Sequence, residues 1–212
     1  MIVTGCNLFH MEEKPANYFK ILSLYRADYA TSLHVRAIGK LLNISHMTLL
    51  PHLKRLEELK ILYSERTGKN KQYRLNKENI LTKHYLTITE ELVTIDYLEK
   101  TFLIKKLAEH LNSIDTANPL ILFGSYAKDY ATEVSDIDLF CIGELAENQK
   151  NNIKNFETTY GKKINIKTAT IENFNTSLRT GDLLIKEIIK NHIILRNSDP
   201  FVTILWRHYI ER

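Results

Sequence analysis

The chain has 212 residues, of which 44% are hydrophobic and 25% are charged, a composition typical of soluble proteins with one large or two small domains. No apolar run approaches the roughly 18 residues that a membrane span needs, and the first residues lack the basic and apolar segments of a secretory signal. Cys6 and Cys141 lie far apart without metal-ligand spacing. We therefore expect reduced thiols in a cytoplasmic protein that has no membrane partner.

Positive charge gathers in the first part of the chain. Residues 1–80 carry 13 Lys and Arg against 7 Asp and Glu, whereas residues 81–212 carry 16 against 18, which together give the net +4 of the chain. This asymmetry indicates that the N-terminal part contacts a polyanion. Solvated lysine-rich faces give similar counts, so the residues around these charges must distinguish a polyanion contact from a solvated surface.

Three helices are predicted in this basic part. Apolar residues recur at helical spacing over 17–29 and again over 35–42. The turn 43–45 then ends in the N-cap residue Ser45, and a third helix follows. Its inward residues are Leu49, Leu53 and Leu56, and its outward residues are Met47, Thr48, Pro51, Lys54 and Arg55. Pro51 removes an interior hydrogen bond and should bend this helix. Two helices joined by so short a turn predict a helix-turn-helix.

A hairpin with a basic tip is predicted next, over 61–66 and 71–75. The stretch 34–76 resembles the winged-helix transcription regulators of bacteria and archaea along its whole length. The resemblance implies that the third helix enters the major groove of double-stranded DNA. The predicted base-edge contacts are Ser45, Met47 and Thr48, and the predicted phosphate contacts are Lys54, Arg55, Arg66, Lys69 and Lys71. A protein–protein module is the alternative, and the local basicity favours DNA.

Residues 80–114 contain no Pro or Gly and predict a helical connector, with a second helix beginning near Thr101. A heptad-like seam is formed by Tyr85, Ile88, Leu92, Ile95 and Phe102. The seam either joins two chains in a homodimer or packs against the chain's own domains. The second half-site that a winged helix usually needs on DNA favours the homodimer.

A Gly-Ser pair and two aspartates stand in the last third. A short buried strand runs into Gly124 and Ser125, and ten residues later Asp136 and Asp138 open a second strand. Alternation places both carboxylates on one face, roughly 6.5–7 Å apart along the strand. Such a pair suits two Mg²⁺ ions about 3.5–4 Å apart that hold a triphosphate for in-line displacement. Gly124 lets the backbone approach the phosphates, and the N–H and hydroxyl of Ser125 can donate to them.

This pattern of G-S, ten residues and D-x-D after a strand resembles the minimal nucleotidyltransferases of the polymerase-beta-like superfamily, over residues 119–195. The resemblance implies a small mixed-sheet fold, a nucleoside triphosphate as ligand or substrate, and Mg²⁺ held by Asp136 and Asp138 as catalytic and metal-binding residues. The predicted nucleotide-binding residues are Gly124, Ser125, Lys128, Asn165 and Lys167.

The chain also departs from the pattern of that family. Asp129 stands where many members have a glycine. On the later strand, Lys163, Asn165 and Lys167 share the face that points to the aspartates, and Asn165 stands where the family has a third carboxylate. An amide ligates Mg²⁺ poorly and cannot act as a base, while Lys167 could place an ammonium where a metal would be. Glu172 is the nearest carboxylate downstream, in the following turn or helix.

The predicted architecture is α+β: a winged helix-turn-helix over 1–79, a helical connector or dimerisation segment over 80–116, and a nucleotidyltransferase-like domain over 117–212. We interpret the chain as a DNA-binding transcriptional regulator that carries a domain for NTP and Mg²⁺. The alternative is an active nucleotidyltransferase that moves NMP from NTP to a protein, such as a partner toxin, or to a small-molecule hydroxyl. Both interpretations begin with triphosphate binding and differ over Asn165. The apolar tail 201–206 is expected to dock within the chain.

Overall fold

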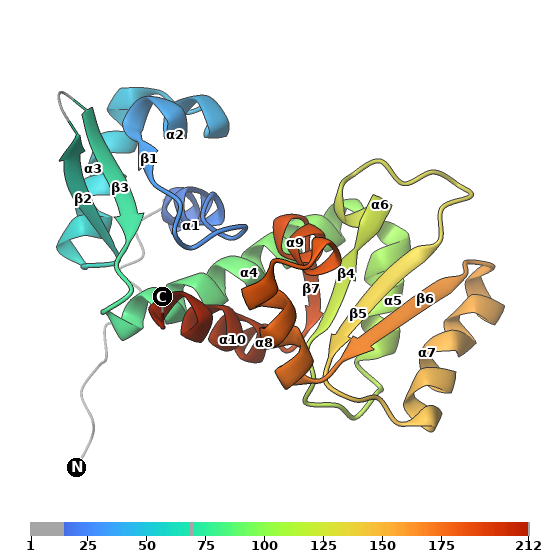
Figure 1. Ribbon diagram of the computed structural model, residues 1–212. Helices are drawn as coiled ribbons and strands as arrows, with labels where there is room; N and C mark the ends of the chain where they lie inside the picture. Colours follow the sequence, from blue (N-terminus) through green and yellow to red (C-terminus); the bar gives the residue numbers. More distant parts are fainter. Residues whose placement is uncertain (1–14, 68–69, 212) are drawn as a thin grey trace, which may run out of the picture.

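The computed structural model describes residues 15–67 and 70–211, which are arranged around two small sheets (Figure 1). A three-stranded antiparallel sheet of order β1-β3-β2 lies at the N-terminal end, and a four-stranded sheet of order β6-β5-β4-β7 lies at the other. This agrees with the expected α+β class. None of the helices in these residues has the length and apolar character needed to cross a bilayer.

The N-terminal elements follow the predicted order. They are α1 (Pro15–Ser23), β1 (Leu33–His34), α2 (Val35–Leu42), α3 (His46–Glu58), β2 (Leu62–Thr67) and β3 (Asn70–Leu75). Ser45 caps α3 as predicted, because its hydroxyl accepts the N–H of Thr48 at 3.1 Å. β2 and β3 pair as the predicted hairpin, and Lys69 at its tip lies outside the described residues. β1 is not predicted, since two residues are too few to show an alternating pattern.

The first helix is shorter than the prediction over 17–29, because α1 ends at Ser23. The hydroxyl of Ser23 donates to the carbonyl of Lys20 at 2.8 Å, and the chain continues in tighter turns in which the N–H of Tyr25 bonds the carbonyl of Leu22 at 3.0 Å. Such local hydrogen bonds compete with continuation of an α-helix. Tyr25 and Tyr29 are buried all the same, so the spacing identified the core residues and missed the helix end.

The long helix α4 (Ile80–Lys100) connects the two sheets, and α5 (Phe102–Leu111) follows after the expected break at Thr101. α1, α10 (Ser198–Ile210) and β7 (Ile193–Arg196) all pack against α4 (Figure 1). The residues of the predicted seam differ in their exposure. Tyr85 is partly buried and stacks on Phe19, whereas Ile88, Leu92, Ile95 and Phe102 stay 45%, 39%, 51% and 70% exposed.

The C-terminal sheet is mixed, as expected. Its elements are β4 (Leu120–Phe123), α6 (Gly124–Ala127), β5 (Ile137–Ile142), α7 (Glu147–Tyr160), β6 (Ile164–Ala169), α8 (Ile171–Thr180) and α9 (Leu183–Lys190), followed by β7. β4 pairs antiparallel with β5 and β7, and β5 pairs parallel with β6. The apolar residues of α5 and α7 cover one face of the sheet, and those of α8, α9 and α10 cover the other.

The apolar tail docks within the chain, as expected. Phe201, Val202, Leu205 and Trp206 of α10 are buried, and the Trp206 ring lies 6.4 Å from that of Tyr29 in the N-terminal elements. One apolar core therefore runs from the N-terminal helices through α4 and α10 to the covered face of β4. Burial of this continuous surface stabilises the packing of the two sheets on α4.

A buried charge cluster lies where these elements meet. The carboxylate of Glu90 on α4 is 2.6 Å from Nη2 of Arg26, which follows α1, and 3.2 Å from Nε2 of His192, which precedes β7. Arg26 Nη2 also donates to the carbonyl of His192 at 2.9 Å. Burial alone would raise the pKa of Glu90, but the charges of His192 and Arg26 outweigh it and lower the pKa to about 2. The stabilisation from the ionised carboxylate is therefore present above its ordinary pKa of 4.5 and is lost as the pH falls towards 2.

We expect Arg26→Ala to lower the free energy of unfolding by about 3–5 kcal/mol, because it leaves the Glu90 charge buried with only His192 beside it. Urea titration at neutral pH measures this. Arg55→Ala is the matched control: Arg55 and its partner Glu58 are about half exposed, so this change should cost about 1 kcal/mol or less. Equal losses in the two variants would show that the buried cluster does not hold the elements together.

Candidate functional site

The candidate site forms where β4 ends. The chain turns at Gly124, whose φ of +73° lies in the left-handed region that favours glycine. A Cβ added there would lie 2.4 Å from Oδ2 of Asp138, so no side chain fits without displacing that carboxylate. The backbone of the Gly-Ser turn and the second aspartate are therefore in close contact, whereas the sequence pattern predicted only that Gly124 lets the backbone approach phosphates.

Strand alternation brings the carboxylates together. Ile137 and Leu139 of β5 are buried against α5 and α7, so Asp138 between them faces the other side of the sheet. The β5–β6 register sets Asp138 beside Asn165. The Asn165 amide donates to Asp138 Oδ1 at 3.1 Å and to Asp136 Oδ2 at 3.3 Å. The structure thus places three of the predicted site residues in one hydrogen-bonded group.

Lys163 completes this group, although it is not among the predicted site residues. Its Nζ lies 3.2 Å from Oδ2 of Asp136. Hydrogen bonds from Lys163 and then from Asn165 lower the pKa of Asp136, so its carboxylate is held in the ionised form. Alternation of the strand predicts that Lys163 faces the aspartates together with Asn165, and the ion pair with Asp136 is what the structure adds.

The two other predicted nucleotide-binding lysines have different surroundings. The Nζ of Lys167 lies 5.9 Å from the ring centre of Phe123, which directly precedes the Gly-Ser turn. Lys128 instead forms an ion pair with Glu187 of α9 and lies 5.7 Å from the ring centre of Tyr130. Lys167 is therefore beside the turn, whereas Lys128 would have to leave Glu187 to contact a phosphate.

The backbone conformation at Asp129 explains why an aspartate can stand where many members of the family have a glycine. Its φ is +57°, a left-handed conformation that glycine adopts most easily and that Asp adopts more readily than most other residues. The N–H of Asp129 donates to the carbonyl of Tyr126 at 3.2 Å and closes the turn after α6. The backbone shape that a glycine would give is kept here by an aspartate.

The donor set fits one divalent cation. Mg²⁺ is commonly held by one or two carboxylates together with substrate phosphates, and Asp136 and Asp138 supply two carboxylates on one face. Within residues 15–67 and 70–211, no group of three or more His, Cys, Asp or Glu could hold a metal. Glu172 lies exposed in the first turn of α8. The site therefore has the ligands for one cation and lacks the third carboxylate of the family pattern.

A second surface lies on the outer side of α3. Met47 is 77% exposed, and Thr48, Pro51 and Lys54 are exposed as well, whereas the three leucines predicted to face inward are buried. The Ser45 hydroxyl lies 2.8 Å from that of Thr48, so these two predicted base contacts also bond each other. The predicted outward face of this helix is confirmed.

The predicted phosphate contacts around α3 fall into two groups. Lys54 and Arg66 are exposed. Arg55 pairs with Glu58 at 3.3 Å, and Lys71 pairs with Glu57 at 2.7 Å. The last two residues can reach a phosphate only by exchanging a carboxylate partner for it, which the sequence alone did not indicate.

We expect Gly124→Ala to abolish binding of Mg·ATP, because the added methyl group displaces Asp138. Gly161→Ala is the matched control: Gly161 has a φ of +64°, but an added Cβ would meet nothing within 4 Å. Backbone strain alone should cost the control about 1 kcal/mol of stability and leave the site intact. Urea titration and calorimetry with Mg·ATP measure the two effects. Equal behaviour of the two variants in both measurements would contradict the close approach at Gly124.

Comparisons with known proteins agree with this geometry. Residues 104–195 match the family described as nucleotidyltransferase domain. A protein of Methanocaldococcus jannaschii that is named as a protein adenylyltransferase is 33% identical over 101 residues, which are 44% of this chain and 65% of the relative. The chain thus spans less than two thirds of that relative's length. No solved structure matches significantly. The match over residues 104–195 runs from α5 into β7 and includes the whole candidate site, so this part of the chain is similar to a nucleotidyltransferase domain.

Proposed function

We propose that this chain transfers a nucleoside monophosphate from a nucleoside triphosphate to a hydroxyl group of an acceptor. The observation that carries the proposal is the contact of the Gly124 turn with Asp138, beside Asp136 on the same face of the sheet. The family match over the same residues supports it. The name of the archaeal relative favours ATP as the donor and a protein as the acceptor.

The residues of the site divide the chemistry between them. The acceptor oxygen attacks the α-phosphorus, the bond from that phosphorus to the β-phosphate oxygen breaks, and pyrophosphate leaves. Asp136 and Asp138 would hold one Mg²⁺, which when bound neutralises charge on the triphosphate. The N–H and hydroxyl of Ser125 donate to phosphate oxygens.

Asn165 limits the rate in this proposal. Its amide fixes the two carboxylates through hydrogen bonds of 3.1 and 3.3 Å, but it cannot take the proton of the acceptor hydroxyl. That proton therefore leaves to solvent, and transfer is slow compared with a site that has a third carboxylate.

We expect Asp138→Asn to abolish transfer of label from α-labelled ATP, and Asn165→Asp to raise the turnover by roughly a hundredfold or more, since a general base commonly contributes about 10²–10⁴. Label incorporation into acceptor protein measures both variants, with pyrophosphate release as the second readout. Calorimetry with Mg·ATP is run beside it.

Each result has a separate meaning. Absence of Mg·ATP binding in the unmodified chain would refute the proposed function. Mg·ATP binding without transfer in both the unmodified chain and Asn165→Asp would favour the domain as a nucleotide sensor that regulates the N-terminal elements.

We propose, as a second function, that the N-terminal elements bind double-stranded DNA. α2, a three-residue turn, α3 and the β2–β3 hairpin follow one another in the order of a winged helix. The exposed outer face of α3 carries Met47, Thr48 and Lys54, in a part of the chain with a net charge of +6. Two copies would pair through the exposed apolar residues Ile88, Leu92 and Ile95 of α4, which gives a homodimer with two DNA-binding surfaces.

We expect Lys54→Ala to weaken binding of mixed-sequence duplex DNA and to lower the salt slope of log K by about 1, because one phosphate contact is removed. Fluorescence anisotropy between 50 and 200 mM salt, about the range over which such contacts weaken strongly, measures this. Lys105→Ala removes the same charge from the exposed surface of α5 and should leave the slope unchanged. Absence of binding by the unmodified chain at low salt would exclude the DNA-binding function.

A further inference from the structure

β6 is an edge strand of the nucleotidyltransferase sheet. It pairs with β5 on one side, and within residues 15–67 and 70–211 the sheet order β6-β5-β4-β7 places no strand on its other side (Figure 1). It is also the strand that carries Asn165, beside the two aspartates. The strand that forms the free edge of the sheet therefore also carries part of the candidate site.

The hydrogen-bond pattern shows which main-chain groups of β6 face outward. The carbonyls of Lys163 and Ala169 accept N–H groups of Ile137 and Gly143, so alternate residues from 163 to 169 direct their main chain towards β5. Ile164, Ile166 and Thr168 direct theirs away from the sheet. An outward row of N–H and C=O groups is a template on which an extended segment can form a further strand.

One outward group already has an acidic partner. The N–H of Ile164 donates to Oε1 of Glu157, a residue of α7, at 2.7 Å. A carboxylate of the chain itself thus occupies the first position of the free edge. The next two outward residues, Ile166 and Thr168, lie further along the same edge, and β5 is the strand with which β6 pairs among the described residues.

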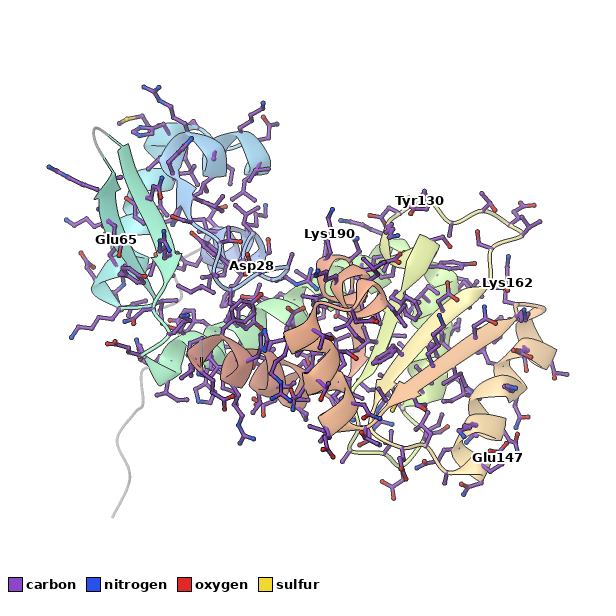
Figure 2. All side chains as sticks on the ribbon, viewed as in Figure 1. Asp28, Glu65, Tyr130, Glu147, Lys162 and Lys190 are labelled. Atoms are coloured by element: carbon purple, nitrogen blue, oxygen red, sulfur yellow. The ribbon has the colours of Figure 1, made fainter. Side chains whose placement is uncertain are left out.

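An open groove of about 710 Å³ follows this edge and reaches the site. It is lined by residues of β6 and α7, and its lining includes Asp138 and Asn165 of the candidate site. Its lysines are Lys150 and Lys154 of α7 with Lys163 and Lys167 beside or on β6. Two of these lysines already have a carboxylate partner: Lys150 lies 3.5 Å from Glu147, and Lys163 lies 3.2 Å from Asp136. The carboxylate of Glu157 accepts the N–H of Ile164. Figure 2 labels Glu147, the first residue of α7, and Lys162, which lies between α7 and β6.

We propose that this groove binds the acceptor as an extended, acidic polypeptide segment that adds to β6 as a fifth strand. The inference rests on the proposed transfer reaction and names the class of its acceptor. Main-chain hydrogen bonds to Ile166 and Thr168 give the segment its direction, and the lysines select acidic side chains. Lysines at a sheet edge also discourage pairing with neutral or basic strands, which sharpens that selection.

The same groups distinguish a polypeptide from a nucleic acid. An extended peptide offers alternating N–H and C=O groups that match both the donors and the acceptors of the edge. A phosphodiester chain offers no donors for the carbonyls of Ile166 and Thr168. None of the residues that line the groove is aromatic, so bases would find no ring to stack on.

The geometry also brings the acceptor to the aspartates. Neighbouring strands lie about 4.8 Å apart, so a strand on β6 is separated from Asp138 of β5 by β6 alone. A side chain of the added strand on the face of Asn165 then lies on the same face as the two carboxylates, about 10 Å from Asp138, which is two strand spacings. A hydroxyl on that side chain can reach a phosphate held there.

The probe for this proposal is a fluorescein-labelled copolymer of Glu and Tyr, whose binding is measured by anisotropy on the full chain. Two variants test different parts of the groove. Lys150→Glu with Lys154→Glu reverses the charge of α7. Thr168→Pro removes an outward N–H and leaves the ladder to β5 in place. Lys105→Glu on α5 is the matched charge control.

We expect the α7 double variant to raise the Kd for the copolymer about tenfold, Thr168→Pro to weaken binding as well, and Lys105→Glu to have no effect. Mg·ATP binding should be unchanged in all three. The proposal is overturned if both groove variants bind the copolymer as the unmodified chain does, since the copolymer then binds elsewhere. The proposal is also overturned if the groove variants still bind the copolymer but no longer bind a labelled single-stranded oligonucleotide, since the groove then binds nucleic acid. Failure of the unmodified chain to bind Mg·ATP would refute the transfer reaction itself. Calorimetry measures that binding separately from the anisotropy experiment, so the two failures can be distinguished.

Discussion

The buried carboxylate of Glu90 fixes how the two sheets stand on α4. Its partners come from both sides: Arg26 from the end of the N-terminal helix α1, and His192 from the residue before β7. An unpaired charge in this position is costly, so the packing that brings all three together is strongly favoured over others. Because β7 pairs with β4, and β4 runs into the Gly-Ser turn, the position of the candidate site relative to the N-terminal elements depends on this cluster.

The candidate site and the proposed DNA-binding surface are joined by packing as well as by charge. The sheet face that carries Asp138 is the one covered by α8, α9 and α10, and α10 also contacts Tyr29 in the N-terminal elements. A change at the nucleotide site that moves these helices is therefore felt in the same apolar core that supports α3. Close-packed interiors transmit such displacements because they leave little room for local adjustment.

Features with a local signal were predicted from the sequence. The cap at Ser45, the inward leucines of α3, the break at Thr101 and the common face of Asp136 and Asp138 all follow from spacing within one segment. Features that need a distant partner were missed. The Lys128–Glu187 ion pair joins α9 to the turn after α6, and the pairing of Lys71 with Glu57 joins the hairpin to α3. Periodicity carries no information on such contacts, because they depend on how separate elements pack.

Gly124 and Asn165 differ in how freely evolution can change them. Gly124 has a left-handed backbone and no room for a Cβ, so replacement there damages the turn itself. Asn165 is partly exposed on an edge strand that has one neighbour, and exchange with a carboxylate of nearly the same size disturbs little packing. The exchange would leave the Gly-Ser turn intact, but it would replace two hydrogen bonds with a third carboxylate beside Asp136 and Asp138, whose repulsion a bound cation would relieve. Under the proposed function, position 165 can therefore set the rate of transfer without any rebuilding of the turn at Gly124.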